Sequence, residues 1–178
     1  PPPPPAFHAD PGKRDWSVTG VQTCALPIFL PYVRWVRSFS CTEGNELIPA
    51  IAAENGLKTM VGVWLDDDKE HNEKELVNAI EVAKAGHANI LAVGNEVLLR
   101  GELTEDELID YINRAKQAVP GVEVGYVDAY FEFNDHPRVT EACDVILANC
   151  YPFWEGCPAD HALLYMKEMY RRAQHAAN

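Results

Sequence analysis

Residues 89–97 read NILAVGNEV, and this stretch decides how the chain folds. Its β-branched, apolar run is typical of a buried strand, and the Gly-Asn-Glu that follows places polar groups where that strand ends. Comparable runs occur at residues 32–40, 59–65, 122–130 and 144–153. Their centres recur about every 28 residues, the length of one strand plus one helix, so the sequence predicts a parallel sheet with crossover helices.

Helix signals stand between these strands. Residues 72–75 (NEKE) and 104–107 (TEDE) each match a capping box, in which a side chain accepts from an unpaired backbone N–H and a carboxylate reaches back. Gly56 and Gly86 stand where left-handed C-terminal caps belong. The intervening segments are therefore predicted to be helices.

A last helix is predicted after Pro158. It places apolar residues along one side: Leu163, Leu164, Met166, Met169 and Tyr170. At this spacing such a stripe is far more often core than a cofactor site, so we expect these residues to be buried.

Two architectures fit five strands with crossover helices: an open doubly wound sheet, or part of a (β/α) barrel. A nucleotide-binding open sheet should carry a Gly-rich phosphate loop after its first strand, and the sequence has none. Polar and aromatic residues gather instead at the C-terminal ends of several strands, where barrels build their active sites. The predicted fold class is α/β, a partial (β/α)8 TIM barrel.

Composition narrows the functional classes. The chain has 178 residues and a formal net charge of −12, and residues 29–178 carry all of that charge. Nucleic acid is not an expected partner, because the chain lacks the basic stripe that a phosphate backbone needs. The uncharged run at residues 16–33 has the length of a membrane span, but polar residues and prolines interrupt it, so no transmembrane segment is expected.

The first 28 residues differ from the rest and hold 7 of the 13 prolines. Residues 18–28 (VTGVQTCALPI) resemble the conceptual translation of a sequencing-library adapter. We expect two parts: a non-native or disordered prefix at residues 1–28, and an incomplete barrel domain at residues 29–178. The alternative is a natural Pro-rich leader.

Sequencing reads across the codon for Phe29 test the adapter interpretation. We expect no continuous genomic coverage at that point, because the prefix would have been joined to the gene during library construction. Uninterrupted coverage would instead establish the natural leader.

The polar pair Asn95 and Glu96 is the first candidate for chemistry. Neighbours on a strand point to opposite faces, so both can serve one pocket only if the strand ends or bulges there. A carboxyl group among apolar walls can deliver a proton at neutral pH, and an amide can bond a sugar hydroxyl. The alternative is a surface carboxylate that caps the next turn.

Aromatic residues cluster at the same strand ends: Trp64, Tyr126, Tyr130, Tyr151, Phe153 and Trp154. Flat aromatic faces pack against the C–H faces of pyranose rings, so this rim suits a glycan. The alternative is aromatic core, which we expect for some of these residues, for Phe153 more than for Trp154.

Five strings in register resemble the family 17 glycoside hydrolases, and the bacterial branch most closely: VRSFSCTEGNELIP, KTMVGVWL, AVGNEVLLRGELTEDEL, VGYVDAY and CDVILANCYPFWEGC. The resemblance spans residues 32–170. It implies a (β/α)8 barrel that acts on β-1,3-glucan by a retaining mechanism with two carboxylates.

The resemblance also implies roles for individual residues. Glu96 would be the general acid/base, and Asn95 would hold the substrate beside the scissile bond. Tyr151 would lie near the nucleophile, and Arg37 would orient carboxylates. The expected sugar subsites involve Trp64, Asp128, Tyr130 and Trp154.

The family's nucleophile is a glutamate in a Glu-Thr-Gly-Trp motif on the seventh strand, and this sequence has no such motif. We therefore expect strands 2 to 6 with their helices, without strand 1 and strands 7 to 8, and an inactive fragment. Glu43, Glu132 and Glu155 also follow strand ends, and we expect them to be solvated loop residues. Two alternatives stay open: a β-1,3-glucan transglycosylase, and a non-catalytic glucan-binding module.

No metal or cofactor is expected. The acidic run at residues 66–68 precedes a helix, where negative charge is favoured by the helix dipole. The cysteines outside the prefix form no CxxC pair; Cys150 and Cys157 could form a disulfide or stay free. The compartment stays open, although a site outside the cytoplasm is favoured for a complete glucanase.

Overall fold

The computed structural model describes residues 30–177 of the chain. It contains one parallel sheet with its strands in the order of the sequence. The strands are β1 (Trp35–Arg37), β2 (Lys58–Val63), β3 (Ile90–Asn95), β4 (Glu123–Ala129) and β5 (Val145–Asn149). The helices are η1 (Asn45–Leu47), α2 (Ile48–Glu54), α3 (Lys69–Lys84), α4 (Glu105–Ala118), α5 (Glu132–Asp135), α6 (Pro137–Ala142) and α7 (Ala162–Ala176).

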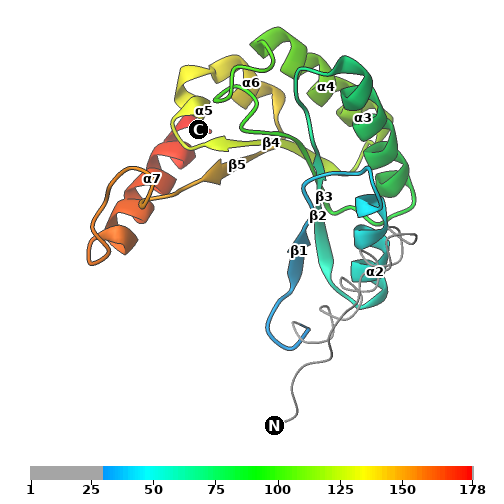
Figure 1. Ribbon diagram of the computed structural model, residues 1–178, viewed down its shortest axis with the longest axis horizontal. Coiled ribbons are helices and arrows are strands. Elements are labelled where there is room, and N and C mark those ends of the chain that lie inside the picture. The colour runs from blue at the N-terminus through cyan, green and yellow to red at the C-terminus, as the bar shows by residue number, and fades with distance from the viewer. Residues whose placement is uncertain (1–29, 178) are drawn as a thin grey trace, which may run out of the picture.

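The strand order decides between the two predicted architectures. Each strand pairs in parallel with the next strand along the chain, from β1 to β5. A doubly wound sheet reverses its order at a switch point, and this sheet does not. Figure 1 shows the sheet curving as an arc with the helices on its outer side. The fold is therefore a curled half-barrel, consistent with the predicted partial TIM barrel.

All five predicted strands are present, but the two outermost are shorter than predicted. Only Trp35–Arg37 of residues 32–40 and Val145–Asn149 of residues 144–153 form regular strand. Each of these strands pairs on one side only among the described residues. With fewer neighbours to satisfy its backbone groups, an edge strand ends sooner.

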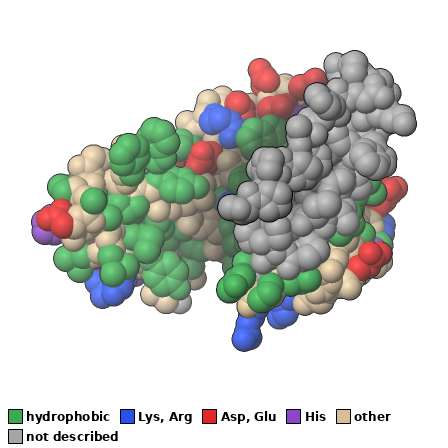
Figure 2. Space-filling model, turned by 60° about the horizontal axis from the view of Figure 1, so that its bottom comes forward, with side chains coloured by type: hydrophobic (Ala, Val, Ile, Leu, Met, Phe, Trp, Pro, Cys, Tyr) green, Lys and Arg blue, Asp and Glu red, His purple; other side chains and the backbone are tan. Residues whose placement is uncertain are grey.

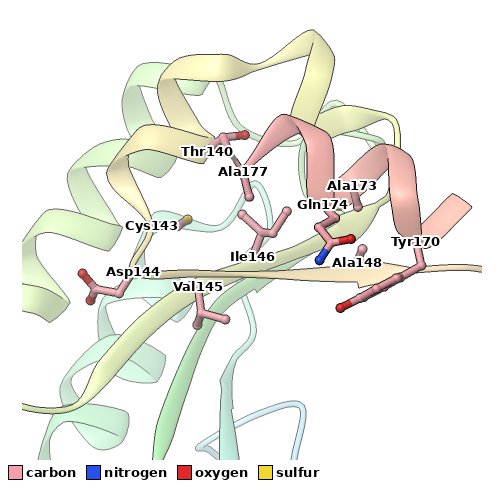
Figure 3. A pocket seen from close by; sticks show the side chains of 10 residues that line it. All are labelled: Thr140, Cys143, Asp144, Val145, Ile146, Ala148, Tyr170, Ala173, Gln174 and Ala177. Carbon is pink, nitrogen blue, oxygen red and sulfur yellow. The ribbon is translucent and has the colours of Figure 1, made fainter.

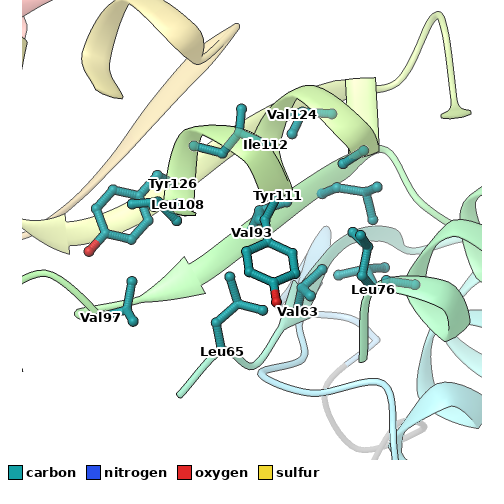
Figure 4. Packing of buried hydrophobic residues seen from close by; sticks show 14 of the residues in the cluster. Val63, Leu65, Leu76, Val93, Val97, Leu108, Tyr111, Ile112, Val124 and Tyr126 are labelled. Atoms are coloured by element: carbon teal, nitrogen blue, oxygen red, sulfur yellow. The ribbon is translucent and has the colours of Figure 1, made fainter. Parts of the chain in front are cut away.

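The main core lies between the sheet and the helices α3 and α4. Strand residues such as Val63 and Val93 meet Leu76 from α3 and Leu108 and Ile112 from α4, all of them nearly inaccessible to solvent (Figure 4). The apolar faces of the two helices therefore fix them against the strands that carry the polar strand ends.

One predicted capping box is confirmed and the other is wrong. Thr104 caps α4 as predicted, with reciprocal bonds to Glu107. The cap of α3 is instead Asp68, whose Oδ1 accepts from the backbone N–H groups of Glu70 and His71. Asp68 begins the helix four residues before Asn72, so Asn72 lies inside the helix and is buried. The predicted caps Gly56 and Gly86 both have positive φ.

Glu75 was predicted to belong to the capping box of α3. It is instead fully buried, and it holds the loop after β1. Its carboxylate accepts from the hydroxyls of Ser40 and Thr42, both at 2.5 Å, and from the backbone N–H groups of Cys41 (2.8 Å) and Trp64 (2.9 Å). A buried carboxylate is stable only when its oxygens are bonded in this way. Glu75 thus ties the C-terminal end of β1 to that of β2.

The apolar stripe predicted on the last helix is mostly exposed, which contradicts the expectation of core. Only Met169 of the five residues is buried, whereas Leu164 is 68% exposed. Figure 2 shows many hydrophobic side chains on the surface. Among the described residues α7 packs mainly against β5 and α5, and most of the stripe stays exposed.

A cavity of about 380 Å³ lies between β5 and α7. Ile146 and Ala148 of β5 point toward Ala173 of α7 and Ala177 just after it, whereas Val145 points to the opposite face of the sheet (Figure 3). The packing of α7 on the sheet is therefore open at this edge.

Among residues 30–177 no helix combines the length and apolar character needed to cross a bilayer.

The Glu75 network predicts a specific stability effect. Glu75→Gln should lower the free energy of unfolding by roughly 2–4 kcal/mol, because an amide cannot accept all four bonds and buries an unpaired donor. Urea denaturation followed by circular dichroism measures the change.

The matched control is Glu73→Gln on the same helix. Glu73 pairs with Arg114 at the surface, and such exposed pairs contribute about 1 kcal/mol or less. Equal losses in the two variants would show that the buried network contributes nothing of its own.

Candidate active site

A bulge at the end of β3 presents the polar pair. Ala92 pairs with Gly125 and Asn95 with Val127, so β3 contains one residue more than β4 over this interval. Gly94 has φ 84°, and a Cβ there would lie 3.1 Å from the ring of Tyr126. The prediction that the strand ends or bulges at the polar pair is confirmed. Both side chains can therefore serve one site.

Glu96 follows directly and is itself left-handed, with φ 56°. This conformation is rare for a residue with a side chain and persists only where neighbouring contacts impose it. The Glu96 N–H donates to the Val127 carbonyl at 2.8 Å, and its Oε1 accepts from Asn149 Nδ2 at 2.6 Å. Backbone and carboxyl group are thus both held from neighbouring strands.

Arg37 orients the other member of the pair. Its Nη2 donates to Asn95 Oδ1 at 2.7 Å, and its guanidinium lies 4.2 Å from the centre of the Phe39 ring. Burial lowers the pKa of Arg37, while interactions with Tyr151 and Glu96 oppose that shift. The strand ends of β1 and β3 and the segment after β5 therefore meet around one guanidinium.

The loop after Glu96 is anchored from β2 and from β4. Arg100 donates to the carbonyl groups of Asn95 and Leu65, and its guanidinium lies 4.9 Å from the ring centre of Trp64. From the other side, the Tyr126 hydroxyl accepts from the Leu98 N–H at 3.0 Å. These bonds leave the loop little freedom.

Asp128 does not line the site and lies beneath it. The side chain is fully buried and accepts from the Tyr126 hydroxyl and from the Ala129 N–H. Burial raises the pKa of Asp128 to about 6. The expected sugar contact of Asp128 is therefore corrected: the carboxyl group supports the residues that surround the cavity.

A cavity of about 420 Å³ lies at the C-terminal ends of β3, β4 and β5. Glu96, Tyr130, Tyr151 and Trp154 are among the residues that line it. Trp154 is 79% exposed, whereas Tyr130 is nearly buried. The cavity is therefore lined by the carboxyl group of Glu96 on one side and by exposed aromatic side chains on another.

Trp64 does not border this cavity; it is half-buried beneath Arg100. Asn149, which bonds Glu96, was not among the residues predicted for the site, although a polar residue at the end of a predicted strand was a usable signal. Glu155 was expected to be a solvated loop residue. It is an exposed loop residue, and it also lines the cavity, where its Oε2 accepts from Tyr165 (2.9 Å) and Tyr130 (3.3 Å).

The remaining polar clusters offer no metal site within residues 30–177. Asp68 caps α3, and Asp66 accepts from the Asp68 N–H and contacts His71. The cysteines of this part of the chain, including Cys150 and Cys157, are free thiols.

Comparison with known proteins gives relatives of one kind. A glucan 1,3-beta-glucosidase of Arthroderma benhamiae is 28% identical over 136 residues, which cover 73% of this chain and 43% of the relative. A glucan 1,3-beta-glucosidase of Saccharomyces cerevisiae is 29% identical over 147 residues, covering 74% and 47%. The chain spans less than half the length of these relatives. Both are fungal, so they lend no support to the bacterial branch.

A solved structure shares the fold. The family 17 beta-1,3-glucanosyltransferase from Rhizomucor miehei superposes with a TM-score of 0.81 at 25% identity, covering 89% of this chain and 61% of that one. An active-site mutant of the same enzyme, in complex with laminaritriose, gives a TM-score of 0.79 at 26% identity, covering 87% and 60%.

The profile of the BtgE/BtgC glycoside hydrolase domain matches residues 25–178. This match covers more than half of the chain, and it agrees with the family 17 motifs and with the curled parallel sheet. The chain belongs to the BtgE/BtgC glycoside hydrolase domain family.

Proposed function

We propose that this chain supplies the acid/base half of a site that cleaves β-1,3-glucan by a retaining mechanism. The observation that carries the proposal is Glu96, which the bulge of β3 and the bond from Asn149 hold at a cavity with an aromatic side. The glucan 1,3-beta-glucosidases among the relatives support the substrate class.

The hydrogen bonds of the site support a separate role for each polar group. Asn149 donates to Oε1 of Glu96, which leaves Oε2 to hold the proton for the leaving glycosidic oxygen. Asn95 accepts from Arg37 at Oδ1, so its Nδ2 donors stay available for a sugar hydroxyl. Trp154 and Tyr151 offer exposed ring faces on which pyranose rings can stack.

A retaining mechanism needs a second carboxyl group about 5 to 5.5 Å from the first. Glu155 is the other carboxylate of the cavity, and two phenols already bond its Oε2, which makes it a poor nucleophile. The buried Nε of Arg37 has no hydrogen-bond partner among residues 30–177. It is a donor on which a further carboxylate can be oriented.

We place the five strands as the second to sixth of an eight-stranded barrel, with the domain beginning at residue 29. The adapter-like prefix lies outside the described residues. In this arrangement the nucleophile belongs to a strand that the five do not include, and the 178-residue chain does not turn over substrate.

Transglycosylation is the second candidate, and the glucanosyltransferase among the solved neighbours favours it. Both reactions share the protonation step at Glu96. They differ in whether water or a sugar hydroxyl accepts the glycosyl group. The open aromatic surface beside Trp154 is compatible with a sugar acceptor.

The first prediction concerns turnover. The 178-residue chain should release no detectable reducing sugar from laminarin, because residues 30–177 offer only Glu155 beside Glu96 at the cavity, and two phenols already bond Glu155. Hydrolysis that disappears in Glu96→Gln would show that the described site already contains a working nucleophile.

The second prediction concerns binding. Isothermal titration of laminaritriose should show an affinity that falls about tenfold or more in Trp154→Ala, because the exposed indole face stacks on a sugar ring. An unchanged affinity in this variant would remove Trp154 from the site.

Trp35→Ala is the matched control. Trp35 is also partly exposed, but it lies on β1 and does not line the cavity. Its loss should leave the affinity unchanged. If neither variant nor the unmodified chain binds laminaritriose, the glucan-binding alternative fails as well.

A further inference from the structure

Two buried residues of β4 lie directly beneath the loop that carries Glu96. Tyr126 donates its hydroxyl proton to Asp128 and accepts the Leu98 N–H at the same oxygen. Its ring also lies against the bulge, within 3.1 Å of where a Cβ of Gly94 would be. The pair thus contacts β3 just before Glu96 and the loop two residues after it.

A carboxyl group is an unfavourable choice for this position. Asp128 is fully buried, and no Lys, Arg or His among residues 30–177 forms an ion pair with it. Of the titratable groups packed nearby, Tyr126 donates to it and Glu132 of α5 repels it, while His136 contacts Glu132 at 3.2 Å. Burial raises its pKa to about 6, so ionisation of Asp128 is disfavoured in the fold.

Packing of the core alone does not require a hydroxyl at position 126 or a carboxyl group at position 128. An apolar residue at position 128 would avoid the desolvation, but it would leave the Tyr126 hydroxyl without an acceptor. A hydroxyl whose proton is bonded to an acceptor keeps one orientation, and this orientation fixes where its oxygen can accept. The Tyr126 oxygen accepts there from the Leu98 N–H.

We propose that Tyr126 and Asp128 are positioning residues that hold the Glu96 loop in register with β4. The proposal rests on the proposed function of Glu96 and names the groups that fix its place. Asp128 orients the Tyr126 hydroxyl, the hydroxyl holds Leu98, and the Glu96 N–H bonds Val127 between the two. Without the hydroxyl, the Leu98 N–H two residues after the left-handed Glu96 loses its acceptor, while the bonds from Leu99 to Asp128 and from Arg100 to Leu65 remain.

The test is Tyr126→Phe, followed by nuclear magnetic resonance on the 178-residue chain. Loss of the hydroxyl should speed hydrogen exchange at the Leu98 amide at least tenfold, because its acceptor is gone. The side-chain amide signal of Asn149, which bonds Glu96 Oε1, should shift as the carboxyl group leaves its place.

Tyr111→Phe is the matched control. Tyr111 is a nearly buried tyrosine of α4 whose hydroxyl interacts with Asn72 and Glu73, away from the site. This variant should leave the Leu98 exchange and the Asn149 signal unchanged even where its thermal stability falls as much. Equal effects in the two variants, or none in Tyr126→Phe, would overturn the proposal.

A pH titration isolates Asp128. In the unmodified chain the Leu98 amide signal should shift with a midpoint near pH 6, and the shift should vanish in Asp128→Asn but persist in Glu96→Gln. A shift that vanishes in Glu96→Gln instead would assign it to the acid/base residue and contradict the role of Asp128.

The pair also predicts the direction of a stability change. Because the folded pKa of Asp128 is raised above its ordinary value of 3.8, the contribution of Asp128 to the free energy of unfolding is most favourable at low pH and is lost as pH rises through about 6.

The exchange, titration and stability measurements need no glucan, so failure of laminaritriose to bind would refute the proposed function without deciding the positioning role.

Discussion

The extra residue at the end of β3 is the constraint on which the site depends. In a regular strand Asn95 and Glu96 would face opposite sides of the sheet, one toward the helices and one away. The bulge at Gly94 and the left-handed backbone of Glu96 cancel that alternation. A left-handed glutamate is strained by roughly 1–3 kcal/mol. The bond that its N–H donates to Val127 and the bond that its carboxylate accepts from Asn149 hold it in this conformation.

Two buried carboxyl groups support this arrangement from below. Glu75 bonds the loop after β1, whose strand carries Arg37, and Asp128 bonds Tyr126 under the loop after β3. Glu75 accepts from Cys41 and Trp64, and Asp128 accepts from Tyr126 and from the backbone of Leu99, so each ties together segments that are distant in the sequence. Their common effect is to fix loops at the C-terminal edge of a parallel sheet, where the polar side chains converge.

The open ends of the arc account for the largest departure from the predicted core. The helical period predicted an apolar side for α7, but periodicity reports which residues share a face and not what covers that face. In the described residues Met169 and Ala173 of α7 pack against Tyr130, which follows β4, and against Ile146 and Ala148 of β5. The remaining stripe and the aromatic groups beside the cavity stay exposed.

The sequence by itself determined the five strands, the helices between them, the cap at Thr104 and the placement of Glu96 at a strand end, because these follow from local period and turn chemistry. Only the tertiary structure decided the strand order, the true cap at Asp68 and the partners Asn149 and Tyr126. The physical reason is that a hydrogen bond between strands depends on register, and register is set by packing across the whole sheet rather than by any one segment.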